Sequence, residues 1–310
     1  MSGGEEPKLG HLLETYLRNK TLLFVGDSIT ESVWDFLLCE GHRERLRSIR
    51  SDDTERGKER GKIDLTTQSL RDVAFREQVA SFWDAWFGAP WGADGVPLAM
   101  DTRVELFPAT RTILARRHIH RFKRSDAAAL AGLGDVVVFN FGLHYDLENE
   151  RQAEEYRADV RELAAILAPL TAAPGRAAFF RETSAQHFRD TGAFANWEQA
   201  HLVGNLTKCE CLEMSAGVER GNKMAQFNDM AAGILPASGV GLLPFYDFTA
   251  RLHMAHEEDF CSYKKEYRDD AKLKYSCCDC SHFCYSPQFS DHVLATLGEG
   301  LRGSRVLEER

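Results

Sequence analysis

The sequence predicts an α/β fold in which helices cover both faces of a central parallel sheet. Short apolar runs bounded by glycine or polar residues are typical of strands buried on both faces. Segments with helical spacing of apolar residues alternate with these runs along the chain. The length of 310 residues is ample for a large core. No linker divides the chain, so we expect one main domain.

The N-terminal half is expected to open on a strand, a tight turn and a helix. The apolar run at 21–25 stops at Gly26, and helical spacing follows at 29–38. The other elements expected in this half are a short helix at 12–17, a surface loop at 41–62, an irregular loop at 81–97, and strands at 103–107 and 111–119.

The C-terminal half alternates more clearly between the two kinds of element. Its expected strands and helices lie at 135–140, 150–170, 176–180, 219–233, 240–245 and 290–301. We divide the chain into an N-terminal extension at 1–20, a catalytic domain at 21–302 and a C-terminal tail at 303–310.

Composition narrows the classes of function. The net charge of −9 argues against wholesale binding to nucleic acid. A hydrophobic content of 44% with 27% charged residues is ordinary for a globular protein and argues against disorder. No apolar run approaches the roughly 18 residues that span a bilayer. The polar stretch at 1–10 has no apolar h-region, so no signal peptide is read there.

Ser28 is the first candidate catalytic residue, because it follows Gly26 and Asp27 at the carboxyl end of the first expected strand. Ligands of parallel α/β sheets gather at this edge. A serine hydroxyl becomes a nucleophile when a base takes its proton, and the amides of a helix N-terminus stabilise an oxyanion. The alternative is a helix cap, in which Asp27 or Ser28 binds free backbone N–H groups.

Asp279 and His282 are the second candidate pair. An aspartate three residues before a histidine can orient the imidazole and stabilise the imidazolium. Cysteines surround the pair, which leaves disulfides, zinc and unpaired thiols as alternatives. We expect at least two disulfides, one of them tying Cys280 or Cys284. The eight cysteines are Cys39, Cys209, Cys211, Cys261, Cys277, Cys278, Cys280 and Cys284.

Four blocks stand in order along the chain: 26–28 with Trp34 and 37–39, then 135–142, 180–188 and 279–284. Together they resemble the trichome birefringence-like family and its PC-esterase relatives in the SGNH hydrolase superfamily. The resemblance covers about residues 20–300. It implies a flavodoxin-like three-layer sandwich and O-acyl transfer, usually of acetyl groups, to or from carbohydrate.

The resemblance also implies roles for particular residues. Ser28 would be the nucleophile, His282 the base and Asp279 the residue that orients the base. No metal or organic cofactor is needed. The expected partners are an acyl donor and a carbohydrate acceptor, without nucleic acid, and we expect a monomer. The family typically works in the Golgi or outside the cell and contains structural disulfides.

Oxyanion or substrate roles are expected for a further set of residues, for which a turn-forming or structural role is the alternative. Asn140 stands at a strand's carboxyl end, which independently favours a place near the oxyanion. The set is Gly26, Asp27, Asn140, Gly142, Arg181 and His187. The aromatic residues Trp83, Trp86 and Trp91 are candidates for a sugar-binding surface, or else anchors that pack a long loop.

The chain also departs from the family pattern. In the family a histidine directly follows the glycine of the second block, whereas here Leu143 separates Gly142 from His144. In and after the last block, Phe283 replaces a tryptophan, and the stretch 285–289 replaces a segment expected to shape the acceptor site. The expected function is O-acetyl transfer to carbohydrate hydroxyls, with an O-acetylesterase of the same fold as the alternative. Two further hypotheses are a non-catalytic carbohydrate-binding protein and a zinc-binding interaction protein.

Overall fold

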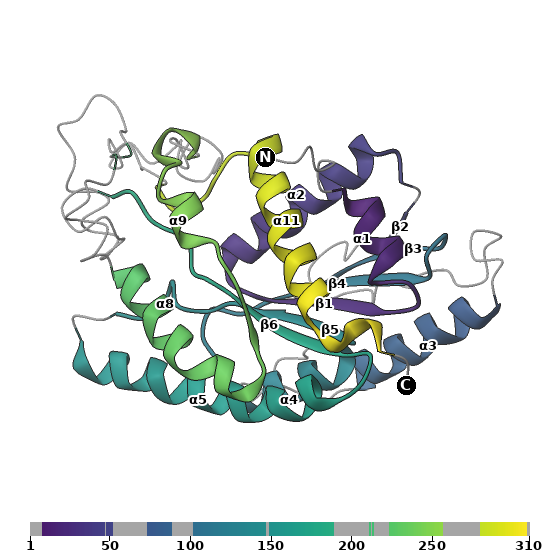
Figure 1. The fold of residues 1–310 in the computed structure, drawn as a ribbon, viewed down its shortest axis with the longest axis horizontal. Coiled ribbons are helices and arrows are strands. Elements are labelled where there is room, and N and C mark those ends of the chain that lie inside the picture. The colour runs from purple at the N-terminus through teal and green to yellow at the C-terminus, as the bar shows by residue number, and fades with distance from the viewer. Residues whose placement is uncertain are drawn as a thin grey trace, which may run out of the picture.

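A seven-stranded sheet, ordered β2-β3-β4-β1-β5-β6-β7, forms the middle layer of the described chain (Figure 1). The computed structural model describes residues 8–46, 48–51, 73–88, 102–146, 149–188, 211, 213, 223–256 and 280–308. Helices cover both faces of the sheet, so the predicted α/β class is confirmed and the layering is compatible with a flavodoxin-like sandwich.

Five neighbouring strands of the sheet pair in parallel, and the other two strands join one edge through antiparallel pairings. The parallel strands are β4 (Thr112–His118), β1 (Thr21–Gly26), β5 (Val136–Phe139), β6 (Ala177–Arg181) and β7 (Gly241–Leu243).

The prediction of a purely parallel sheet is wrong at one edge. Strand β3 (Thr102–Phe107) is antiparallel to β4, and β2 (Ile49–Ser51) is antiparallel to β3. A short turn connects β3 to β4, with Arg111 at a φ of 54°. So short a connection joins antiparallel neighbours, whereas parallel neighbours need a long crossover.

The helices divide between the two faces (Figure 1). One face carries α1 (Leu9–Thr15), α2 (Ser28–Arg43) and α11 (Pro287–Gly303). The other carries α3 (Val73–Gly88), α4 (Arg124–Leu133), α5 (Glu150–Ala172) and α8 (Lys223–Ile234). Shorter helical segments are η1 (Leu235–Ser238), α9 (Tyr246–Thr249), η2 (His253–Ala255) and η4 (Arg305–Leu307).

Strand β1 has a continuously apolar run because helices cover it on both faces. Leu23 and Val25 pack into the core beneath α4 and α5, while Leu22 and Phe24 pack into the core beneath α2 and α11. Side chains alternate between the faces of a strand, so a strand covered on both sides needs apolar residues at every position.

Residues from both ends of the chain contribute to the second of these cores. Leu12 and Leu13 of α1 and Val306 of η4 are buried against the face that carries α2 and α11. The stretches assigned to an extension and a tail therefore include side chains of the domain's own core. None of the helices in the described ranges is long and apolar enough to cross a lipid bilayer.

Several predicted boundaries are wrong. Helix α2 runs on to Arg43, because Glu40 is buried there and binds Arg43 and Tyr285. The expected loop at 41–62 therefore begins inside α2, and it contains strand β2. The expected irregular loop at 81–97 begins inside α3, and helix α4 was not expected at all.

Gly26 ends β1 where other segments approach closely, and this generates a prediction. A Cβ at Gly26 would collide with Thr30 Oγ1 and lie 2.9 Å from the Asn140 carbonyl oxygen. We expect Gly26→Ala to lower the free energy of unfolding by roughly 1–3 kcal/mol, because the surrounding backbone must shift. Urea unfolding measures this change.

Gly132→Ala is the matched control. Gly132 lies on the exposed side of α4, where a Cβ meets nothing within 4 Å. Alanine favours a helix over glycine by roughly 0.5–1 kcal/mol, so this variant should be as stable as the wild type or more stable. Equal destabilisation of the two variants would contradict the steric argument at Gly26.

Candidate functional site

The carboxyl ends of β1 and β5 meet at the centre of the sheet, where the chain leaves them toward opposite faces. Strand β1 continues into α2 on one face, and the chain after β5 leads to α5 on the other (Figure 1). Adjacent strands that diverge in this way mark the usual ligand site of an open α/β sheet. The backbone N–H of Asn140 donates to the Val25 carbonyl at 2.9 Å. The structure thus brings Gly26, Asp27 and Ser28 beside Asn140.

The sequence left open whether Asp27 or Ser28 caps the helix, and the structure assigns the cap to Asp27. Asp27 is the N-cap of α2, and its fully buried carboxylate accepts a hydrogen bond from Ile29 N–H at 3.1 Å. Ser28 is the first residue of α2 and is half-buried. No described residue hydrogen-bonds its hydroxyl. Partial positive charge at a helix N-terminus favours a negative charge near this position.

Arg181 supports the Asp27 turn from within the protein. It ends β6, is buried, and donates to Thr30 Oγ1 at 3.1 Å and to the Glu182 carbonyl at 3.0 Å. Burial lowers the pKa of Arg181 to about 10, and the negative charge of Asp27 opposes this shift. Contact with a substrate, the role expected for Arg181, would require it to leave these partners.

The Asn140 side chain links the ends of β5 and β6. Its amide donates to the Arg181 carbonyl at 2.9 Å and to Thr183 Oγ1 at 3.4 Å. Both amide hydrogens are therefore directed to protein acceptors, and service as an oxyanion donor requires one of them to turn. Gly142 follows, and a Cβ there would lie 2.5 Å from Thr183 Oγ1. The absence of a side chain at Gly142 lets these segments approach.

Three histidines at this edge were not among the predicted site residues. His118 ends β4, His120 follows two residues later, and His144 follows β5. His118 Nε2 lies 3.4 Å from His120 Nδ1, which lies 3.3 Å from His144 Nε2. Desolvation lowers the pKa of His144, and the charge of Asp27 opposes that shift. The alternating His-Ile-His sequence at a strand's carboxyl end is one signal for this row.

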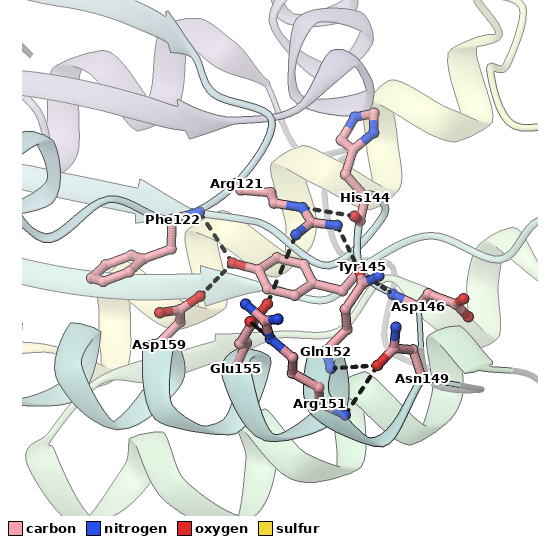
Figure 2. A network of polar contacts seen from close by, with 10 residues as sticks. All are labelled: Arg121, Phe122, His144, Tyr145, Asp146, Asn149, Arg151, Gln152, Glu155 and Asp159. Atoms are coloured by element: carbon pink, nitrogen blue, oxygen red, sulfur yellow. Dashed lines mark hydrogen bonds and ion pairs between the residues drawn. The ribbon is translucent and has the colours of Figure 1, made fainter. Parts of the chain in front are cut away.

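A polar network fixes the backbone that carries His144 to α5 (Figure 2). Arg121 donates to the His144 carbonyl at 3.0 Å and to Gln152 Oε1 at 2.6 Å, and its guanidinium lies 5.0 Å from the centre of the Tyr145 ring. Tyr145 in turn donates to Asp159 Oδ2 at 2.5 Å. The His144 imidazole points away from this network in Figure 2.

The segment that carries His282 is tied to distant parts of the chain. A disulfide joins Cys211 to Cys280 across a sequence separation of 69 residues, which confirms the expected bond to Cys280. In the chain-entropy model, closing a loop of this length contributes roughly 4 kcal/mol to stability. His282 itself is half-buried. The expectation of at least two disulfides stays a prediction.

Part of the predicted site lies outside the described residues. Asp279 lies outside, so the full triad of Ser28, His282 and Asp279 is not placed. Trp91 and the side chains of Trp83 and Trp86 are outside as well.

The zinc alternative also involves residues outside the described part, namely Cys277 and Cys278. Within the described ranges, no group of three or more His, Cys, Asp or Glu residues is arranged to hold a metal ion.

Comparison of the chain with models of known protein families finds no match, and comparison with curated proteins finds none either.

The hydrogen bond between buried Tyr145 and half-buried Asp159 generates a prediction about pH. Burial raises the pKa of Asp159, and the hydrogen bond from Tyr145 opposes that shift. A carboxyl whose pKa is raised by folding contributes stability below its unfolded pKa and loses that contribution as pH rises through the folded pKa. We expect wild type to gain stability relative to Asp159→Asn as pH falls from neutral toward about 4.

Urea unfolding across this pH range measures the difference between the two proteins. Glu308→Gln is the control of opposite sign, because the hydrogen bond from Arg305 lowers the pKa of Glu308. Wild type should lose stability relative to that variant as pH falls. A difference between wild type and Asp159→Asn that is constant with pH would contradict the role given to burial.

Proposed function

We propose that this protein is a serine-dependent acyl-transfer enzyme with Ser28 as its nucleophile. The observation that carries the proposal is the position of Ser28. Its half-buried hydroxyl stands first in α2, at the diverging ends of β1 and β5, with no hydrogen bond to a described residue. The neighbouring Asp27 already serves as the helix cap, so capping does not account for the serine.

The first amides of α2 supply the chemistry that a serine nucleophile needs. The N–H groups of Ile29 and Thr30 are bound to Asp27, whereas that of Ser28 has no hydrogen-bond acceptor among the described residues. In the proposed reaction, Ser28 Oγ attacks an ester carbonyl while a histidine takes its proton. The Ser28 N–H donates to the oxyanion, the ester's alcohol leaves with the proton, and an acyl-serine remains.

His282 is the proposed base and Asp279 its orienting partner, as the family resemblance implies. His144 is the competing base, because it follows β5 at the edge of the sheet where the neighbouring strand β1 ends just before Ser28. The disulfide between Cys211 and Cys280 supports an oxidising location, such as the Golgi lumen or the extracellular space.

Labelling by a fluorophosphonate serine probe tests the nucleophile. We expect the probe to modify Ser28, and we expect Ser28→Ala to lose labelling and at least about 1000-fold of the turnover of an acetyl ester. Ser32→Ala is the matched control, since Ser32 lies one turn further along α2 and its hydroxyl donates to the Ser28 carbonyl at 3.5 Å. Full turnover by Ser28→Ala would refute the proposal.

Two histidine variants then identify the base. If His282 is the base, His282→Gln should lose nearly as much turnover as Ser28→Ala, while His144→Gln retains most of it. The reverse pattern would assign the base to His144 and leave the serine mechanism in place.

The finer form of the proposal is O-acetyl transfer to a carbohydrate hydroxyl rather than to water. The two nucleophiles are chemically alike, so selection must come from positioning the acceptor, which can contribute roughly 7–11 kcal/mol. We expect added oligosaccharide to gain acetyl groups while the release of free acetate falls. Mass spectrometry of the sugar and an acetate assay measure both products in one tube. If no sugar gains mass and acetate release is unchanged, the enzyme is an esterase.

A further inference from the structure

His187 and His256 form a buried pair that ends on the backbone of His282. His187 is fully buried and His256 is 4% exposed. His187 Nδ1 lies 2.6 Å from His256 Nε2, and His256 Nδ1 lies 2.7 Å from the His282 carbonyl oxygen. The remaining nitrogen, His187 Nε2, lies 3.1 Å from the Ala250 carbonyl oxygen. Both nitrogens of each ring therefore have a partner.

The partners restrict where the protons of the pair reside. A carbonyl oxygen only accepts, so His256 Nδ1 must carry a proton to bond His282. Two neutral rings hold two protons on their four nitrogens. Both short contacts are hydrogen bonds only if the second proton is on His187 Nδ1, which then donates to His256 Nε2. The longest contact, to Ala250, is left without a proton.

A neutral pair agrees with the surroundings of His187. Burial lowers the pKa of His187; the Ala250 carbonyl opposes this shift and the neighbouring His253 adds to it. In this arrangement His187 fixes the tautomer of His256, in the way that an outer hydrogen bond fixes the tautomer of a metal-bound histidine.

The same two histidines hold the chain on both sides of His282. The His187 backbone N–H donates to the Cys280 carbonyl at 3.0 Å. His256 forms a β-bridge with Phe283, and their rings lie 4.3 Å apart. A neighbouring bond runs from the Cys284 N–H to the Ala255 carbonyl at 2.8 Å.

From these contacts we infer that His187 and His256 are positioning residues for His282. The inference rests on the proposed function, in which His282 is the base. A base displaced by about 1 Å from its proton can cost roughly 100-fold in rate. The buried pair sets the position of the His282 backbone, and through it the reach of the imidazole.

Two substitutions of His256 distinguish the contribution of its Nδ1, which bonds the His282 carbonyl, from that of its Nε2, which faces His187. In His256→Asn, the side-chain amide stands near the former Nδ1 and still donates to the His282 carbonyl. In His256→Gln, the amide reaches toward the former Nε2 and His187 but loses the bond to His282. Both variants remove the ring and its packing on Phe283, so they form a matched pair.

We expect His256→Asn to keep most of the wild-type kcat, and His256→Gln to lose about 10- to 100-fold in kcat with little change in KM. A purely structural role would lower the amount of active enzyme equally in both variants. Active-site titration with the fluorophosphonate probe corrects each kcat for the fraction of folded enzyme.

A measurement on the wild type covers the case in which His256→Gln fails to fold. Nitrogen-15 shifts of the His256 ring should show Nδ1 protonated and Nε2 unprotonated at neutral pH. The opposite tautomer would overturn the inference.

Equal loss of kcat in the two variants, or no loss in either, would also overturn the inference while Ser28→Ala remained inactive. That result would leave the proposed function standing. A wild type that is neither labelled nor active would overturn both.

Discussion

The buried charge of Asp27 is the constraint around which the carboxyl edge of the sheet is organised. A carboxylate taken fully out of water is costly unless hydrogen bonds and an opposite charge compensate it. The start of α2 supplies one N–H, that of Ile29, to one carboxylate oxygen, and Arg181 supplies the positive charge. Because Arg181 also binds Thr30, the ends of β1 and β6 and the first turn of α2 are held in one arrangement.

In this arrangement the Ser28 hydroxyl has no hydrogen bond to a described residue, whereas Gly26 and Asp27 are held in place. Gly26 is fixed by close approach of Thr30 and Asn140, and Asp27 by its cap. The histidines follow the same division. His187 and His256 are buried and bond each other and the His282 carbonyl, whereas the row that ends at His144 lies at the carboxyl edge of the sheet.

The sequence predicted the elements whose burial pattern is simple. Strands β1, β5 and β6 are covered on both faces, so their runs are continuously apolar, and α5 presents a regular apolar stripe. Local pattern does not record the antiparallel edge, which depends on the short turn before β4. Helix α4 was missed because its alanines and charges form no strong apolar period.

The sequence identifies candidate site residues most clearly where they form a short local motif. Gly26, Asp27 and Ser28 form such a motif, although the sequence alone could not tell that Asp27, rather than Ser28, caps the helix. The pairing of His187 with His256 joins residues 69 positions apart, and its far end is a backbone carbonyl rather than a side chain. No spacing rule encodes a contact of that kind. For His256, the only trace in the sequence is a histidine in a stretch without a recognisable motif.

The edge strands of the described sheet bear on how readily molecules of this protein associate through strand addition at high concentration. The outermost strands, β2 and β7, have three residues each. An edge strand exposes unpaired backbone groups that can recruit a strand from another molecule, and the risk grows with its length and flatness. Three residues offer too short a template for stable strand addition. The longer strands β1 and β4 would be better templates for strand addition, but they lie inside the sheet and pair with a neighbour on each side.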